Sequence, residues 1–167
     1  MKYLLPLLLL GLVSCNNAAT TSTIEGVQTF TYEGGAHQEG RVEYKEALPV
    51  GGVHNPGWQN CGEYSQPLYN EYAVHSLEHG AVWITYQPGL PAPQLDALRQ
   101  AAAGRTHMLL SPRTEQPAPI VLTAWNAQLE LQQADDARLK TFIQKYEQGG
   151  TAPEIGASCS NAYSGTQ

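Results

Sequence analysis

The segment 70–87 constrains the fold most strongly, because a short helix and a buried strand follow one another almost directly. Its first part, NEYAVHSLEH, is typical of a helix that Asn70 caps and that ends at His79, with Gly80 just past the end. Its second part, AVWITYQ, is rich in β-branched and aromatic residues and predicts a buried strand. We therefore expect a central sheet with helices packed on it.

The rest of the chain continues this alternation of strands and helices. Further strands are expected over residues 27–32, 41–44 and 107–110, and residues 120–131 form one strand or a hairpin around Asn126. Helices are expected over residues 94–103 and 135–147, the second with Leu139, Phe142, Ile143 and Tyr146 on one face. The segment 48–69 is a long loop, and the tail from Gly149 is irregular.

This order predicts a single-domain α/β or α+β sandwich with a mixed sheet over residues 25–167. The order also resembles that of thioredoxin-like folds, although the chain has no C-x-x-C motif. Hydrophobic residues make up 42% of the 167 residues, which is enough for a real core.

The N-terminus has the character of an export signal. Lys2 precedes the apolar run 4–13, which is too short to span a membrane. The tetrapeptide LVSC at residues 12–15 resembles a bacterial lipoprotein box, which implies cleavage after residue 14 and lipidation of Cys15. Residues 15–24 would then form a flexible tether. A plain signal peptide or an uncut anchor is the alternative. We expect an exported protein, anchored to the cell envelope through its lipid.

The net charge of the chain excludes some classes of binding partner. The formal net charge is −6, which argues against binding to nucleic acid and against a polybasic membrane-binding surface. Contact with the membrane is therefore expected only through the N-terminal lipid. An envelope protein is the expected kind of partner.

Two cysteines, Cys61 and Cys159, remain after Cys15 is assigned to the lipid. Disulfides persist in the oxidising conditions that an exported protein meets. We expect a bridge between Cys61 and Cys159 that ties the tail to the body of the domain. Two free thiols, or Cys61 as a metal ligand, are the alternatives.

A histidine pair indicates metal chemistry. His75 and His79 are four residues apart, so a helix places both imidazoles on one face. Met108 is the one methionine after the signal segment, and a neighbouring strand could bring its thioether under this helix. His54 in the long loop could supply a third imidazole. Imidazole with a thioether favours copper, with zinc as the alternative.

The same helix matches the H-x-x-E-H motif of inverted zinc proteases over residues 75–79. In such enzymes the glutamate acts as the general base, and a downstream carboxylate is often the third ligand. Glu147 and Glu154 are the available candidates. We favour a different role for Glu78, in which its carboxylate orients an imidazole ligand.

Three stretches resemble a bacterial exported family known as domain of unknown function 3105. They are PVGGVHNPGWQNCGEY over residues 49–64, AVHSLEHGAVWITYQP over residues 73–88, and a downstream set that includes MLLSP at 108–112 and ends with Cys159. The resemblance implies that His54, Cys61, His75, Glu78, His79, Met108 and Cys159 fall in family motifs. His37 and His107 fall outside them, so neither is a leading ligand candidate.

Three functions are compatible with these observations. The first is an envelope lipoprotein that binds copper for delivery, buffering or electron transfer, with a cuproprotein or another envelope protein as its partner. The second is a metal-free interaction module in which the histidines are structural. The third is a zinc hydrolase that uses Glu78.

Overall fold

The structure is a computed structural model that describes residues 23–167. The expected signal segment and Cys15 lie outside the described residues. Among the described helices, none has the length and apolar character that a membrane crossing needs.

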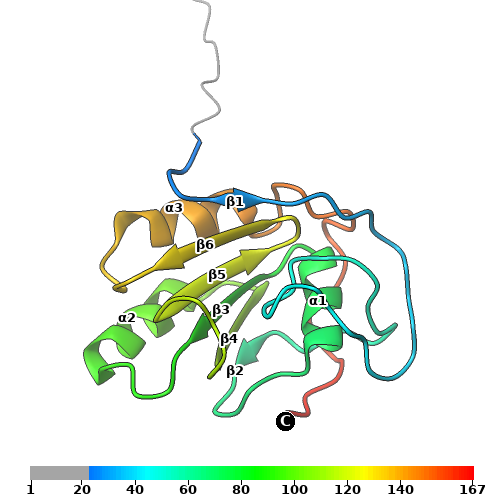
Figure 1. Ribbon diagram of the computed structural model, residues 1–167, viewed down its shortest axis with the longest axis horizontal. Helices are drawn as coiled ribbons and strands as arrows, with labels where there is room; N and C mark the ends of the chain where they lie inside the picture. The colour runs from blue at the N-terminus through cyan, green and yellow to red at the C-terminus, as the bar shows by residue number, and fades with distance from the viewer. Residues whose placement is uncertain (1–22) are drawn as a thin grey trace, which may run out of the picture.

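A mixed sheet forms the centre of the domain (Figure 1). Its strand order is β1-β6-β5-β3-β4-β2. Strands β2, β4 and β3 run parallel to one another, and the pairs β3–β5, β5–β6 and β6–β1 are antiparallel. The strands are β1 (Gln28–Thr29), β2 (Gly62–Glu63), β3 (Val82–Tyr86), β4 (Met108–Pro112), β5 (Ile120–Ala124) and β6 (Ala127–Leu131).

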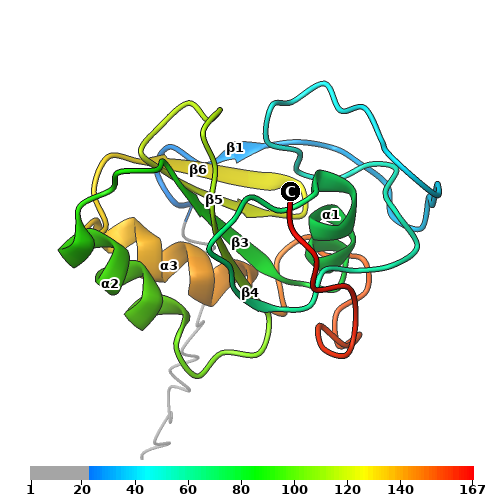
Figure 2. The same ribbon diagram turned by 90° about the horizontal axis from the view of Figure 1, so that it is seen from below.

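Helices cover both faces of this sheet. Helices α2 (Ala92–Ala102) and α3 (Ala137–Tyr146) lie together on one face, and α1 (Asn70–Glu78) lies on the other (Figure 2). The domain is therefore the α+β sandwich with a mixed sheet that the sequence predicts. Helix α3 buries Leu139, Phe142, Ile143 and Tyr146, as expected from their spacing.

The alternation of side chains along the strands divides the interior into two cores. In β3, Val82 and Ile84 point toward α2 and α3, whereas Trp83 points toward α1. The parallel register pairs Val82 with Met108 and Trp83 with Leu109. Met108 therefore shares the core of α2 and α3, and Leu109 shares the core of α1.

Helix α1 ends just before Gly80, as the sequence predicts. His79 is the C-cap, and Gly80 has a φ of 91°, which a residue with a side chain rarely adopts. A Cβ at Gly80 would also lie 2.6 Å from the Nε2 atom of Gln148. The chain can therefore turn from α1 into β3 while the segment after α3 packs against the turn.

Several expected elements differ from the structure. Residues 41–44 are irregular, and the first strand is limited to Gln28–Thr29. The short strand β2 lies inside the segment expected to be a loop. Asn70 was expected to cap α1, but Tyr69 is the N-cap and Asn70 is the first helical residue. The side chain of Asn70 instead accepts a hydrogen bond from Arg113.

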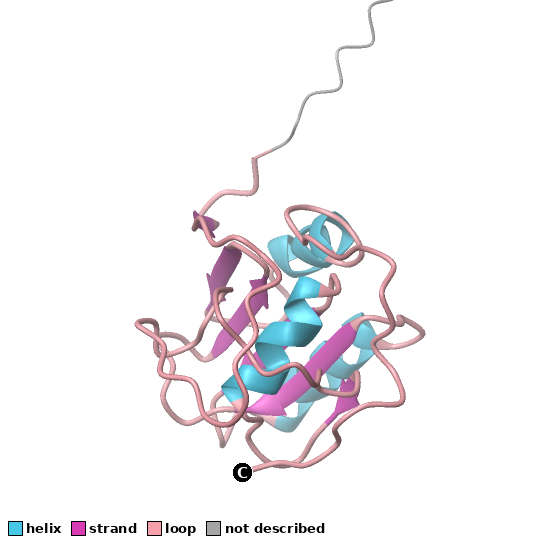
Figure 3. Ribbon diagram, turned by 90° about the vertical axis from the view of Figure 1, so that its right-hand side faces the viewer, coloured by secondary structure: helices cyan, strands magenta, loops and turns pink. Residues whose placement is uncertain are grey.

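Irregular segments wrap around α1 (Figure 3). One precedes the helix, and the other is the C-terminal tail. Cys61 and Cys159 form a disulfide that joins these two segments, as expected. Helix α1 thus lies between the sheet and these two segments. Backbone carbonyls of both segments contact polar side chains of the helix or its C-cap.

Candidate metal centre

Four potential ligands converge on the side of α1 that the wrapping segments cover. His75 and Glu78 come from the helix, and His37 and His54 come from the segment before it. One ligand atom from each lies within 4.8 Å of the other three. We call these four residues the inner group.

A backbone contact brings the two loop histidines together. The N–H of His54 donates to the carbonyl of Ala36, and the N–H of Gln38 donates to the carbonyl of His54. These two hydrogen bonds form an isolated β-bridge between two irregular segments. The ring centroids of His37 and His54 are 4.7 Å apart. His37 is therefore part of the group, so the expectation that it is not a leading ligand candidate is wrong in its geometry.

Backbone carbonyls orient three of the imidazoles in the same way. The Nδ1 atoms of His54, His75 and His79 lie 2.8, 2.7 and 2.7 Å from the carbonyl oxygens of Gly52, Asn55 and Ser158. A carbonyl oxygen can only accept a hydrogen bond, so each Nδ1 must carry a proton. In the neutral ring, Nε2 then holds the free lone pair. Metal-binding histidines are commonly oriented in this way.

His54 and Glu78 face one another in the interior. Nε2 of His54 lies 2.9 Å from Oε2 of Glu78, and both side chains are 0% exposed. Neither atom has a partner in hydrogen-bond geometry among the described residues. Buried polar atoms without such a partner are rare in proteins. In the neutral ring, whose one proton is on Nδ1, a lone pair of Nε2 and a lone pair of Oε2 point toward each other. A cation between the two atoms would stabilise this arrangement.

The backbone also shapes the position of Glu78. Its Oε1 atom accepts a hydrogen bond from the N–H of Gly35. A Cβ at Gly34 would lie 2.6 Å from the same oxygen, so only glycine allows this close approach. Burial is the largest influence and favours the neutral acid. A hydrogen bond from His54, when its Nε2 also carries a proton, and the hydrogen bond from the N–H of Gly35 together outweigh burial and lower the pKa of Glu78. Glu78 is therefore a carboxylate at neutral pH.

His75 is available as a neutral ligand over a wide pH range. Burial is the largest influence and lowers its pKa from 6.5 to about 4, against the opposing hydrogen bond with the carbonyl of Asn55. A metal ion binds the deprotonated nitrogen, so protons compete weakly for His75.

A second set of ligands shares His75. His79 extends the histidine pair along α1, and Glu154 comes from the C-terminal tail. The Nε2 atom of His79 lies 3.4 Å from Oε2 of Glu154, whose side chain is 47% exposed. We call His75, His79 and Glu154 the outer group. The indole of Trp58 covers it, with a centroid 5.1 Å from that of His79.

The printed separations between ligand atoms are close to the separation that one ion requires. Two ligands of a tetrahedral ion with bonds of about 2.1 Å are about 3.4 Å apart. The contact between His79 and Glu154 measures 3.4 Å, whereas Glu78 lies 2.9 Å from His54 and 3.9 Å from His37. The other ligand atoms of each group lie within 4.8 Å of one another, so some of them must move closer together to bind one ion.

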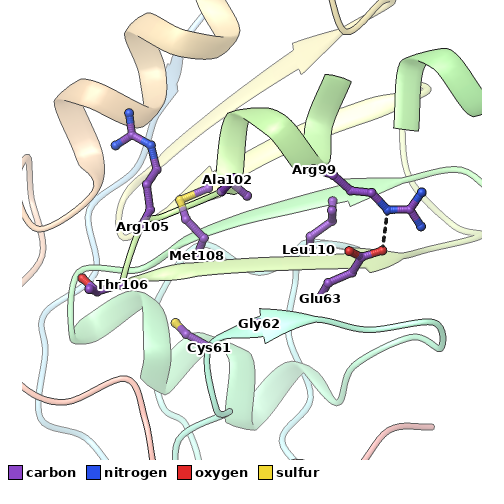
Figure 4. Close-up of a pocket in the computed structure, with 10 residues that line it drawn as sticks. Cys61, Gly62, Glu63, Arg99, Ala102, Arg105, Thr106, Met108 and Leu110 are labelled. Carbon is purple, nitrogen blue, oxygen red and sulfur yellow. Dashed lines mark hydrogen bonds and ion pairs between the residues drawn. The ribbon is translucent and has the colours of Figure 1, made fainter. Parts of the chain in front are cut away.

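Met108 does not join the histidines. Its side chain lies in the core beneath α2, on the other face of the sheet from α1. It lines a pocket of about 330 Å³ together with Ala102, Arg105 and Cys61 (Figure 4). The expected set of two helix histidines with a methionine is therefore not assembled, and the donors present are imidazoles and carboxylates.

The motif of inverted zinc proteases is only partly matched. The outer group contains two histidines and the downstream Glu154 that such a site would use, while Glu147 instead pairs with Arg105. Glu78, the residue that would activate water, is fully buried, and its oxygens face Gly35 and His54. A general base must reach the water that it deprotonates, and the carboxylate of Glu78 points into the inner group.

Comparison with models of protein families assigns the chain to one family. Residues 36–161 match the family described as Protein of unknown function (DUF3105). The chain belongs to this family. The matched range includes all the residues of both groups and both cysteines of the disulfide. Searches of curated proteins and of solved structures found no match, so the resemblance to thioredoxin-like element order stays a prediction.

Proposed function

We propose that this protein binds one divalent transition-metal ion at the histidine and glutamate cluster beside α1. The contact between His54 Nε2 and Glu78 Oε2 carries the proposal, because a cation would relieve the opposition of two buried lone pairs. His75 and His37 complete a set of three imidazoles and one carboxylate.

The donor set guides the choice of metal. Imidazole suits zinc, copper, iron and nickel, and sites of the same type bind Cu²⁺ most tightly among the divalent metals of the first row. Copper in the Cu²⁺ form is therefore our first choice and zinc the alternative. A thioether would have favoured Cu⁺, but Met108 lies on the other face of the sheet.

The same donors favour delivery or buffering over electron transfer. Electron-transfer copper sites combine histidines with a cysteine thiolate and a weak axial ligand. Both cysteines that the structure describes are bonded to one another. With the expected N-terminal lipid, the protein would hold a metal ion at the cell envelope and pass it to an envelope partner.

Titration of the purified protein with Cu²⁺ and Zn²⁺ tests this proposal. We expect one equivalent to bind with a dissociation constant below about 1 μM. His75→Ala should weaken binding by more than about 100-fold, since even residues that only orient a ligand cost about 10- to 100-fold. His107→Ala is the matched control, because His107 contacts the tail through the carbonyl of Ala157 but belongs to neither group.

The assembly of His75, His79 and Glu154 supports a second candidate, a zinc hydrolase. Glu78→Gln distinguishes the two. A hydrolase that depends on Glu78 would lose turnover and keep its metal, because the ligands would come from the outer group. The metal-binding function predicts that Glu78→Gln weakens metal binding itself.

A further inference from the structure

The two ligand groups cannot both hold an ion through His75. The Nδ1 atom of His75 donates to the carbonyl of Asn55, which leaves only Nε2 as a ligand. Nε2 has one lone pair, so it can bind one ion at a time. His75 is nevertheless within reach of the ligands of both groups. An ion bound to His75 therefore has two alternative positions.

The groups differ in their access to solvent. In the inner group, His54 and Glu78 are 0% exposed. In the outer group, the carboxylate of Glu154 is 47% exposed while its partner His79 is nearly buried. A hydrated cation meets a charged oxygen first at Glu154, and it must shed its water before it can reach Glu78.

The tail that carries Glu154 is fixed against α1. The N–H of Glu154 donates to the carbonyl of Glu78, and the carbonyl of Ser158 accepts from His79. The disulfide at Cys159 follows immediately. These contacts hold an exposed carboxylate next to the helix residues that serve both groups, so the outer group is built into the fold.

We propose that the outer group is the loading position for the inner group, with His75 as the ligand common to both. An incoming ion binds His75, His79 and Glu154. It then exchanges His79 and Glu154 for His54 and Glu78 while it stays bound to His75. The exchange moves one ion and changes no oxidation state. This inference rests on the proposed metal-binding function and adds a route to it.

A second approach to the inner group is available in principle. His37 is 38% exposed and lies 3.9 Å from Glu78. An ion that entered at His37 would not need Glu154. The charge of Glu154 and the two helix histidines beside it favour the outer group, and the rate of loading distinguishes the two routes.

Stopped-flow mixing with Co²⁺, followed through its visible absorption, tests the inference on the full chain. Glu154→Gln removes one exposed charge and leaves the inner group intact. We expect it to slow loading about tenfold, at the low end of the effect of local charge on association rates, and to reach the wild-type final spectrum with one Co²⁺ bound. Glu115→Gln, an exposed carboxylate outside both groups, is the matched control.

Two results would overturn the loading position. One is a loading rate for Glu154→Gln within twofold of the wild-type rate. The other is loss of stoichiometric binding in Glu154→Gln, which would make Glu154 a permanent ligand. In both cases the wild type binds Co²⁺, so the proposed function survives. Absence of binding to the wild type would instead refute the proposed function and the inference together.

Discussion

The Nε2 atom of His54 lies 2.9 Å from the Oε2 atom of Glu78, and neither side chain is exposed. The hydrogen bond between His54 Nδ1 and the carbonyl of Gly52 fixes the proton on the other side of the ring. A second proton on His54 would create a buried ion pair, and a metal ion would create a coordination site. The ion pair and the coordination site can be distinguished by experiment, because only the coordination site depends on an added cation.

Replacing Met108 should leave metal binding unchanged. The side chain is buried on the face of the sheet opposite to α1, so Met108→Leu removes no ligand. We expect the same stoichiometry and affinity as in the wild type, and a loss of stability below about 1.5 kcal/mol for a volume-conserving change. Calorimetric titration with Cu²⁺ and chemical unfolding measure the two quantities. A loss of binding would place the thioether at the metal after all.

Removing the disulfide should destabilise the domain. The bridge closes a loop across a sequence separation of 98 residues. Cys61→Ser combined with Cys159→Ser should lower the free energy of unfolding by about 2–5 kcal/mol. Urea unfolding without reductant measures this, and the wild type in reductant should behave like the double variant. Equal stability of the oxidised and reduced wild type would contradict the structural role.

Acidification should destabilise the metal-free protein through His75. Burial lowers its pKa to about 4 from 6.5, so the unfolded chain takes up a proton before the folded protein does. Stability then falls as the pH decreases from about 6.5, and the loss is complete below about 4. Between pH 7 and pH 5 we expect a decrease of about 2 kcal/mol. Urea unfolding with a chelator present should show this slope for the wild type and a smaller slope for His75→Gln.

A methyl group at Gly34 should disturb the inner group from the backbone side. It would lie 2.6 Å from Oε1 of Glu78 and 2.6 Å from Cγ of Pro153. Gly34→Ala should therefore cost about 1–3 kcal/mol of stability through overpacking and weaken metal binding by displacing the carboxylate. Gly57→Ala is a milder control, since its Cβ would make only contacts of 3.4 Å or more. Equal metal affinity in both variants would count against Glu78 as a ligand.

Local patterns were sufficient for the three helices and the four central strands, but not for the short edge strands β1 and β2 or for residues 41–44, which are irregular. The glycine after α1, the spacing of apolar residues in α3 and the hairpin at Asn126, which has a φ of 59°, are all decided by neighbours in sequence. The short strand β2 carries no such pattern, because its two exposed residues form a strand only by pairing with β4.

The ligand set was harder to predict for two physical reasons. Strand β4 is buried on both faces, so its composition does not reveal that Met108 points away from α1 while Leu109 points toward it. His37 reaches the site through a backbone bridge to His54, which joins two irregular segments and has no periodic signal. The histidines of α1 were predictable because helical spacing alone places them on one face.

The metal content of the protein tests the central claim most directly. The full chain, isolated from its native host without chelators, would be analysed by elemental mass spectrometry beside His54→Ala and the control His107→Ala. The account predicts close to one equivalent of copper or zinc in the wild type and in His107→Ala, and a large loss in His54→Ala. Wild-type protein without a transition metal, which also fails to take one up on titration, would contradict it.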